Sequence, residues 1–138
     1  MCPFLFFGDD PVLGSPVILG TPTRAGTYNF TIQVTDQLGG SVSQRFQIKV
    51  VKAVGISTKS LKAGKVKKGY NARLAATGGQ APYSWSVLSG TLSDGLRFDP
   101  SSGSITGTPT TASSGVLTFQ VTDALGGTSQ RALTLTVK

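Results

Sequence analysis

The sequence contains no histidine and no glutamate, and its six acidic residues are all aspartates. Histidine and glutamate are among the side chains that most often carry general acid–base catalysis. Only Asp9–Asp10 and the pair Asp94 and Asp99 stand close together in sequence, and the second pair lies in a turn-rich segment. Aspartate is a common turn residue because its carboxylate accepts backbone N–H bonds. We therefore expect no catalytic residue and a protein that is not an enzyme.

Cysteine and long apolar runs are also scarce. Cys2 is the only cysteine, so no disulfide can form within the chain. No apolar run approaches the length of about 20 residues that a membrane-spanning helix needs. The opening MCPFLFFGDDP has no basic n-region, and its apolar run is too short for a signal peptide. We expect neither a membrane span nor an export signal within the printed sequence.

Charge is sparse and unequal in sign. Charged residues make up 14% of the chain, and the formal net charge is +7. More than half of the cations fall in one window: Lys52, Lys59, Lys62, Lys65, Lys67, Lys68 and Arg73. A solvated linker followed by an edge strand explains this window, because lysines discourage edge-to-edge pairing of sheets. The alternative is a patch for polyanions, and we expect no specific nucleic-acid partner.

What the sequence does contain is an internal repeat. Aligning Ile18 with Ile105 matches the chain through Val50 and Val137 without a gap, at a constant offset of 87 residues. Fifteen of these 33 positions are identical, including the segments Gly20–Thr23 and Gly107–Thr110. A weaker match precedes them, with Asp10, Pro11, Gly14 and Ile18 corresponding to Asp99, Pro100, Gly103 and Ile105 if the first copy has two extra residues. Matching at a fixed spacing indicates tandem copies of one structural module.

The offset also predicts the domain boundaries. If 87 residues is the module length, residues 52–138 form one complete module. Residues 1–51 then form the C-terminal part of a truncated module. We expect a short linker around Val51–Thr58 to join them.

The hydrophobic pattern of both copies is that of β-strands. Apolar residues alternate with polar ones from Tyr28 to Val34 and again from Phe46 to Val50, and the second copy keeps both runs. Period-two alternation is typical of a half-buried strand. The segment Asp-x-Leu-Gly-Gly between the runs predicts a hairpin turn. The complete module adds an alternating run from Tyr70 to Ala76, a second from Tyr83 to Val87, and a short one around Leu96 and Phe98. We predict an all-β fold of antiparallel β-sandwich modules in tandem.

Several motifs of the second copy carry a family resemblance. They are Gly69-Tyr70, Thr77-Gly78-Gly79, Pro82-Tyr83-Ser84-Trp85, Gly95-Leu96, Gly103-Ser104-Ile105-Thr106-Gly107-Thr108-Pro109-Thr110 and Phe119-Gln120-Val121-Thr122-Asp123. Residues 54–138, and residues 8–51 for the later part of the pattern, resemble the bacterial putative-immunoglobulin repeat family, which is similar to dystroglycan-type cadherin-like domains. The resemblance implies an immunoglobulin-like sandwich that serves as a tandem spacer or adhesive module of extracellular or cell-surface bacterial proteins. Its expected partners are neighbouring modules of the parent protein.

The resemblance raises the hypothesis that the protein binds calcium, because the related cadherin-like domains bind this metal between modules. The candidate ligands are Asp36, Asp123 and Asp99, since calcium prefers carboxylate oxygens. The sequence lacks the runs of alternating acids that such sites use, and Asp36 and Asp123 also fit hairpin-turn positions. We expect no cofactor, with calcium as the alternative.

Exposed aromatic residues leave a second binding hypothesis open. Tyr28, Phe30, Phe46, Trp85, Phe98 and Phe119 fall mostly on the inward phase of the alternation, which is typical of core residues. Tyr83 and Tyr70 are the candidates for stacking on sugar rings of surface glycans. A carbohydrate-binding or calcium-dependent adhesion module attached to an extracellular enzyme is therefore the alternative function. We also predict that the incomplete module associates with another chain, by dimerisation, aggregation or strand exchange.

Overall fold

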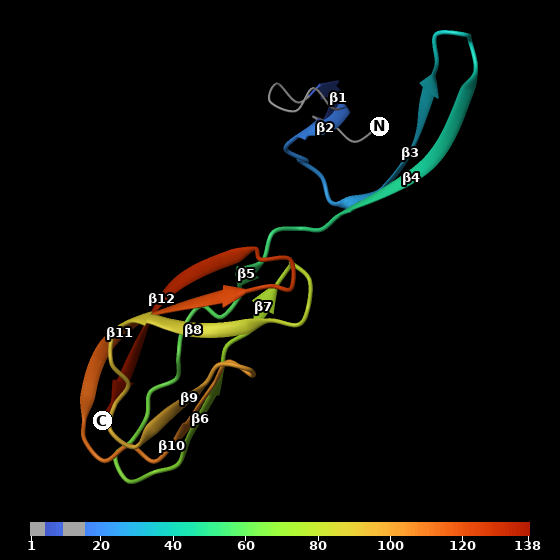
Figure 1. The fold of residues 1–138 in the computed structure, drawn as a ribbon. Coiled ribbons are helices and arrows are strands. Elements are labelled where there is room, and N and C mark those ends of the chain that lie inside the picture. The colour runs from blue at the N-terminus through green and yellow to red at the C-terminus, as the bar shows by residue number, and fades with distance from the viewer. Residues whose placement is uncertain (1–4, 10–15) are drawn as a thin grey trace. The chain divides into compact units, whose positions relative to one another are not determined.

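The computed structural model describes residues 5–9 and 16–138, and it divides the chain into two compact units. Unit 1 comprises Met1–Lys52 and unit 2 comprises Ala53–Lys138 (Figure 1). Cys2, Asp10, Pro11 and Gly14, which the sequence singled out, lie outside the described residues. In the part of the chain that is described, no helix is long and apolar enough to cross a membrane.

Unit 2 is built from short antiparallel sheets. Its strands are β5 (Gly55–Ile56), β6 (Tyr70–Arg73), β7 (Ala76–Thr77), β8 (Ser84–Ser89), β9 (Leu96–Asp99), β10 (Ser104–Gly107), β11 (Ser113–Thr122) and β12 (Thr128–Val137). They form the sheets β6-β10-β9, β12-β11-β8 and β5-β7, and every strand pair is antiparallel.

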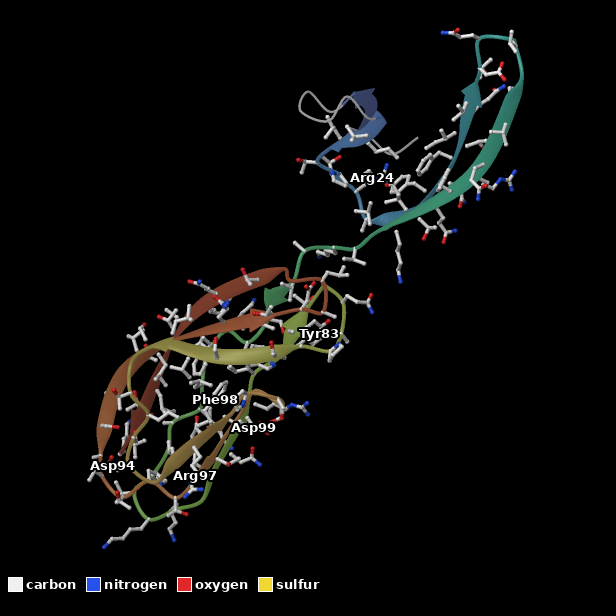
Figure 2. The ribbon with its side chains drawn as sticks, viewed as in Figure 1. Arg24, Tyr83, Asp94, Arg97, Phe98 and Asp99 are labelled. Atoms are coloured by element: carbon white, nitrogen blue, oxygen red, sulfur yellow. The ribbon has the colours of Figure 1, made fainter. Side chains whose placement is uncertain are left out.

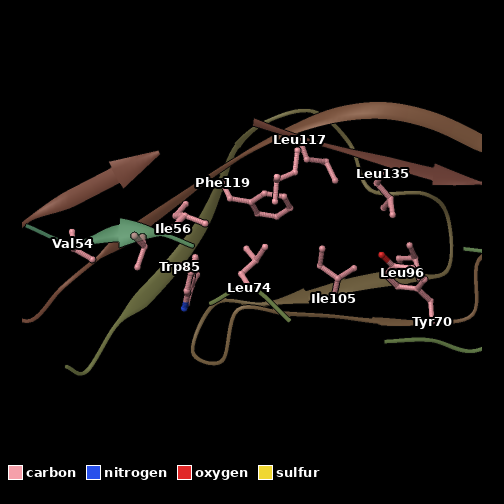
Figure 3. Close-up of a cluster of buried hydrophobic side chains, with 12 residues drawn as sticks. Val54, Ile56, Tyr70, Leu74, Trp85, Leu96, Ile105, Leu117, Phe119 and Leu135 are labelled. Atoms are coloured by element: carbon pink, nitrogen blue, oxygen red, sulfur yellow. The ribbon is translucent and has the colours of Figure 1, made fainter. Parts of the chain in front are cut away.

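The core of unit 2 lies between the two three-stranded sheets (Figure 3). Phe119, Val121 and Ile105 are completely buried there, and Leu117, Leu133 and Leu135 extend the same apolar layer from β11 and β12. The alternate side chains of β11 and β12 face inward because successive residues of a strand point to opposite sides. This arrangement confirms the predicted all-β sandwich.

The C-terminal end of β12 is held by the segment that precedes β6. Gly64 and Val137 form a parallel bridge. The Gly64 N–H donates to the Thr136 carbonyl at 2.8 Å, and the Lys138 N–H donates to the Gly64 carbonyl at 3.0 Å. A third bond runs from the Val66 N–H to the Lys138 carbonyl at 2.8 Å. These bonds extend the sheet beyond β12 and satisfy backbone groups that an edge strand would expose.

The described residues of unit 1 form two antiparallel strand pairs. Strand β1 (Leu5–Asp9) pairs with β2 (Pro16–Gly20), and β3 (Gly26–Thr35) pairs with β4 (Ser41–Val50). The bounds and register of β3–β4 correspond to those of β11–β12 at the offset of 87 residues, so that Phe30 faces Phe46 as Leu117 faces Leu133. The hairpins predicted around Asp-x-Leu-Gly-Gly are therefore confirmed in both copies.

The side chains of the β3–β4 hairpin are much more exposed than those of the β11–β12 hairpin. Val34 is 62% exposed and Phe46 is 42% exposed, whereas their counterparts Val121 and Leu133 are 0% and 4% exposed. Among the described residues of unit 1, no strands correspond to β5, β6, β7 and β8. The expectation that Phe46 belongs to a core is wrong here, because alternation predicts which side chains share a face but not what covers that face.

Two details of unit 2 also differ from expectation. The alternating run from Tyr70 to Ala76 predicts one strand, but the structure divides it into β6 and β7, which lie in different sheets. The Leu74 N–H donates to the Gly103 carbonyl at 2.9 Å, and the Ala75 N–H donates to the Thr58 hydroxyl at 2.8 Å, which marks the change of sheet. The predicted linker around Val51–Thr58 is wrong from Val54 onward, because Val54 and Ile56 belong to the core of unit 2.

Candidate functional site

Asp123 lies at the β11–β12 turn with its carboxylate turned onto the backbone. Its Oδ1 accepts N–H bonds from Leu125 at 3.0 Å and from Gly127 at 2.7 Å. Its Oδ2 accepts the Gln80 N–H at 3.1 Å. Asp123 is itself buried, and three N–H donors compensate for the loss of water around its charge. The residue therefore ties the hairpin turn to the loop between β7 and β8.

Asp36 repeats two of these three bonds in unit 1. Its Oδ1 accepts the Leu38 N–H at 2.9 Å and the Gly40 N–H at 2.8 Å. The Asp36 N–H also donates to the Gly40 carbonyl at 2.8 Å, which closes the turn. Asp36 is exposed. This geometry explains why both copies keep an aspartate two residues before a leucine and four residues before the second glycine.

Asp99 ends β9 and caps the turn that leads to β10. Its Oδ1 accepts the Ser101 N–H at 2.9 Å and the Ser101 hydroxyl at 2.7 Å, and its Oδ2 accepts the Ser102 hydroxyl at 2.6 Å. The hydrogen bond from the Ser102 side chain, followed by those from Ser101, lowers the pKa of Asp99 from 3.8 to about 2. Hydrogen bonds to the charged form stabilise it, so the carboxylate stays ionised well into the acid range.

The structure keeps these three aspartates in separate turns. Asp123 and Asp99 belong to different turns of unit 2, and Asp36 belongs to unit 1. No group of three or more histidine, cysteine, aspartate or glutamate side chains with the geometry to hold a metal occurs within residues 5–9 and 16–138. The calcium hypothesis stays a prediction. The observed role of each carboxylate is to accept hydrogen bonds that stabilise a turn.

Asp94 and Asp99 lie toward opposite ends of β9 (Figure 2). Asp94 and Gly95 form a turn before this strand begins, and Asp99 is its last residue. The Asp94 carbonyl accepts the Thr110 N–H at 2.9 Å, so this residue also takes part in a structural turn. Asp94 and Asp99 therefore belong to two separate turns, one at each end of β9.

An open groove of about 590 Å³ lies on unit 2 beside Tyr83. Its polar and aromatic lining comes from three separate places: Arg73 on β6, Tyr83 and Trp85 at the start of β8, and Ser101 and Ser102 in the β9–β10 turn. Tyr83 is half-buried and its hydroxyl donates to the Gly78 carbonyl at 2.7 Å. The Arg73 Nε donates to the Ser102 carbonyl at 3.1 Å, which positions the guanidinium at the groove.

Of the two tyrosines predicted to contact sugars, the structure therefore brings only Tyr83 to a groove. Tyr70 is buried, its hydroxyl donates to the Lys62 carbonyl at 2.9 Å, and burial raises its pKa. The sequence gives no indication that Arg73, Ser101 and Ser102 are neighbours of Tyr83. The signal was absent because strand pairing, and not proximity in sequence, brings these residues together.

Most of the lysine-rich window lies on one connection between strands. Lys59, Lys62, Lys65, Lys67 and Lys68 are all exposed and lie on the connection between β5 and β6. The Lys62 ammonium lies 5.6 Å from the centre of the Tyr70 ring, a distance suited to a cation–π contact. This position agrees with the interpretation of the window as a solvated connection.

Comparisons with known proteins agree with the sandwich architecture. Residues 14–51 and residues 53–138 each match the family model described as Putative Ig domain. The serine-rich adhesin for platelets of Staphylococcus aureus is 30% identical over 111 residues, which is 79% of this chain and 5% of the adhesin. The chain thus spans a small part of that relative's length.

Two solved structures share the fold at low sequence identity. The extracellular cadherin domains 1–4 of protocadherin gamma B7 match with a TM-score of 0.55 and 18% identity, over 97% of this chain and 38% of that one. A structure described as a putative alpha-galactosidase from Bacteroides fragilis matches with a TM-score of 0.55 and 22% identity, over 62% of this chain and 18% of that one. At these identities the likeness concerns the fold.

Proposed function

Because the chain belongs to the Putative Ig domain family, we propose that it is a non-enzymatic repeat segment of a larger secreted or cell-surface bacterial protein. In that role the modules act as spacers or as adhesive elements. The observation that carries the proposal is the repeat itself: two consecutive segments of the chain match the same family model. Tandem modules of one family are a common way to extend a protein by adding similar units.

The turns of unit 2 support this role. The carboxylates of Asp123 and Asp99 are engaged in bonds that fix turns, and the Asp94 carbonyl accepts the Thr110 N–H in another. Side chains used in this way stabilise a rigid module. The similarity to the S. aureus adhesin favours an adhesive segment over a spacer, and the extracellular setting is part of the same proposal.

Adhesion of coated beads to platelets tests the adhesive role. Beads carrying the full chain are compared, under flow, with beads carrying an unrelated β-sandwich protein at equal density. We expect retention of the first set above the second. Equal retention of the two sets of beads would reject adhesion to platelets and leave the spacer role. The spacer role is tested by deleting this segment from the parent protein and measuring whether the end-to-end length of that protein decreases.

The groove beside Tyr83 favours contact with a glycan as a second candidate function. A half-buried aromatic ring, a guanidinium and two serines line it, and this combination offers a stacking surface with hydrogen-bond partners. On a glycan array, Tyr83→Ala removes the ring and should abolish binding, whereas Tyr83→Phe keeps the ring and should retain it. An array on which the unaltered chain binds nothing would reject this function.

A further inference from the structure

The walls of the groove beside Tyr83 are bonded to one another. The Trp85 N–H donates to the Pro100 carbonyl at 2.8 Å, which ties the start of β8 to the β9–β10 turn. The Leu74 N–H donates to the Gly103 carbonyl, which ties the residue after β6 to the same turn. These bonds fix the shape of the groove. A ligand of a preformed site loses less binding free energy, because it does not have to order the protein.

The hydroxyl groups of the groove are held by bonds of their own. The Tyr83 hydroxyl donates to the Gly78 carbonyl at 2.7 Å. The Ser101 and Ser102 hydroxyls both donate to the Asp99 carboxylate. A hydroxyl carries one proton and two acceptor lone pairs. Because these protons are engaged, the three hydroxyl oxygens accept hydrogen bonds from a ligand, and sugar hydroxyls can donate them.

Arg73 supplies the charge of the groove. Among the residues that line it, Arg73 alone is charged, and the others are apolar or carry a hydroxyl or an indole. Its Nε–H is bonded to the Ser102 carbonyl at 3.1 Å, which leaves four N–H groups on the two terminal nitrogens. Arg73 and Asp99 both pair with Ser104, so strand β10 lies between them. The lining of the groove therefore presents a single positive charge.

A guanidinium is well matched to one class of anion. Its parallel N–H groups fit the two oxygens of a carboxylate, and the resulting charge-assisted hydrogen bonds are stronger than neutral ones. One carboxylate balances one guanidinium. A densely sulfated polymer, by contrast, brings several negative charges to a lining that has one cation.

We propose that this groove binds a sugar that carries a carboxylate, such as a uronic acid or a sialic acid. The carboxylate pairs with Arg73, and a face of the sugar ring packs on the Tyr83 ring. Sugar hydroxyls donate to the Ser101 and Ser102 oxygens. The inference rests on the contact with a glycan proposed above, and it adds the chemical class of that glycan.

Two matched pairs of oligosaccharides test the need for a carboxylate on the full chain. The first pair is oligogalacturonate and its methyl ester, and the second is sialyllactose and lactose. Isotope-labelled chain is titrated with each, and we expect saturable amide shifts in NMR at residues 73, 83, 101 and 102 with an acidic member. Its neutral partner should bind about tenfold more weakly or worse, because it lacks the charge-assisted bonds. The acidic member that binds identifies the source of the carboxylate.

Variants of the chain identify the cation. Arg73→Gln should weaken binding of the acidic sugar about tenfold and affect its neutral partner much less, because it removes the charge that pairs with the carboxylate. Arg73→Lys keeps the charge but loses the planar fork, and it should weaken binding about threefold. Arg97→Gln is the matched control. Arg97 is exposed on β9 and does not line the groove, so its replacement should leave binding unchanged.

The outcomes separate this inference from the proposed function. Equal binding of the acidic and neutral members of both pairs would retain the contact with a glycan and overturn the role of the carboxylate. Unchanged affinity of Arg73→Gln for the acidic sugar would overturn it too, with Trp85 fluorescence during urea denaturation checking that the variant is folded. Binding of sulfated lactose without a response to either acidic sugar would make sulfate the anion. Absence of any saturable shift with all probes at millimolar concentration would reject the contact with a glycan itself.

Discussion

The backbone N–H of Gln80 donates a hydrogen bond to the Asp123 carboxylate at 3.1 Å, across 43 residues of sequence. This bond joins two loops that strand pairing alone would leave independent. The same carboxylate holds the β11–β12 turn through Leu125 and Gly127. One side chain thus couples a local turn to the tertiary structure of unit 2.

Replacing Asp123 should destabilise unit 2 more than replacing Asp36 destabilises unit 1. Asp123→Ala leaves three N–H groups without their acceptor, and we expect a loss of about 1–3 kcal/mol in the free energy of unfolding. Trp85 is the only tryptophan, so its fluorescence during urea denaturation reports on unit 2 alone. Asp36→Ala is the matched control and should leave that transition unchanged. Equal unfolding curves for Asp123→Ala and the unaltered chain would refute this account.

Substitution of Gly103 should destabilise unit 2, because the indole of Trp85 lies beside it. Its φ is +68°, and a Cβ at this position would lie 2.9 Å from the Trp85 Cε2. Gly103→Ala combines backbone strain with a steric clash, and we expect a loss of about 2–4 kcal/mol. Gly126 has a φ of +83° with no atom within 4 Å of such a Cβ, so Gly126→Ala isolates the strain at about 1 kcal/mol. Equal losses in both variants would show that the contact with Trp85 contributes nothing.

The Asp99 turn should weaken in acid. The pKa of Asp99 is about 2 in the folded chain and 3.8 for the ordinary side chain, so the ionised form is preferred in the folded state. Its contribution is therefore complete above about pH 4 and is lost as the pH falls through 2. An NMR titration of the side-chain carboxyl carbon measures the pKa directly. Ser102→Ala should raise it toward 3.8, and an unchanged titration curve in that variant would contradict the assigned cause.

Calcium should add little stability to the full chain. The oxygens of Asp123 and Asp99 already accept N–H and O–H bonds, which a bound cation would have to displace. We expect no increase in melting temperature at millimolar calcium and no heat in isothermal titration. A clear increase that disappears in Asp36→Asn or Asp123→Asn would instead establish those aspartates as ligands.

The sequence predicted the strands of the two long hairpins because their signals are local. Alternation from Tyr28 to Val34, a glycine-rich turn and a second alternating run all lie within one short segment. The turn aspartates were also identified, since Asp36 and Asp123 bond to residues only two and four positions away. Interactions of this range leave their pattern in consecutive residues.

Other features depend on distant partners and were not predicted. Val54 and Ile56 resembled a linker, yet β5 joins the core by pairing with β7. The division of the run after Arg73 follows from bonds to Gly103 and Thr58, which no local pattern indicates. The neighbours of Tyr83 likewise come from separate strands and turns.

The bonds that join Gly64 and Val66 to the end of β12 have a mechanical consequence. In a protein held under tension at both ends of unit 2, the segment at Gly64 is drawn toward the N-terminus while Lys138 is drawn the opposite way. Because the two segments run parallel, their three bonds are loaded in shear and must yield together instead of opening one after another. Separation of this segment from β12 should therefore require a high force and occur as one event.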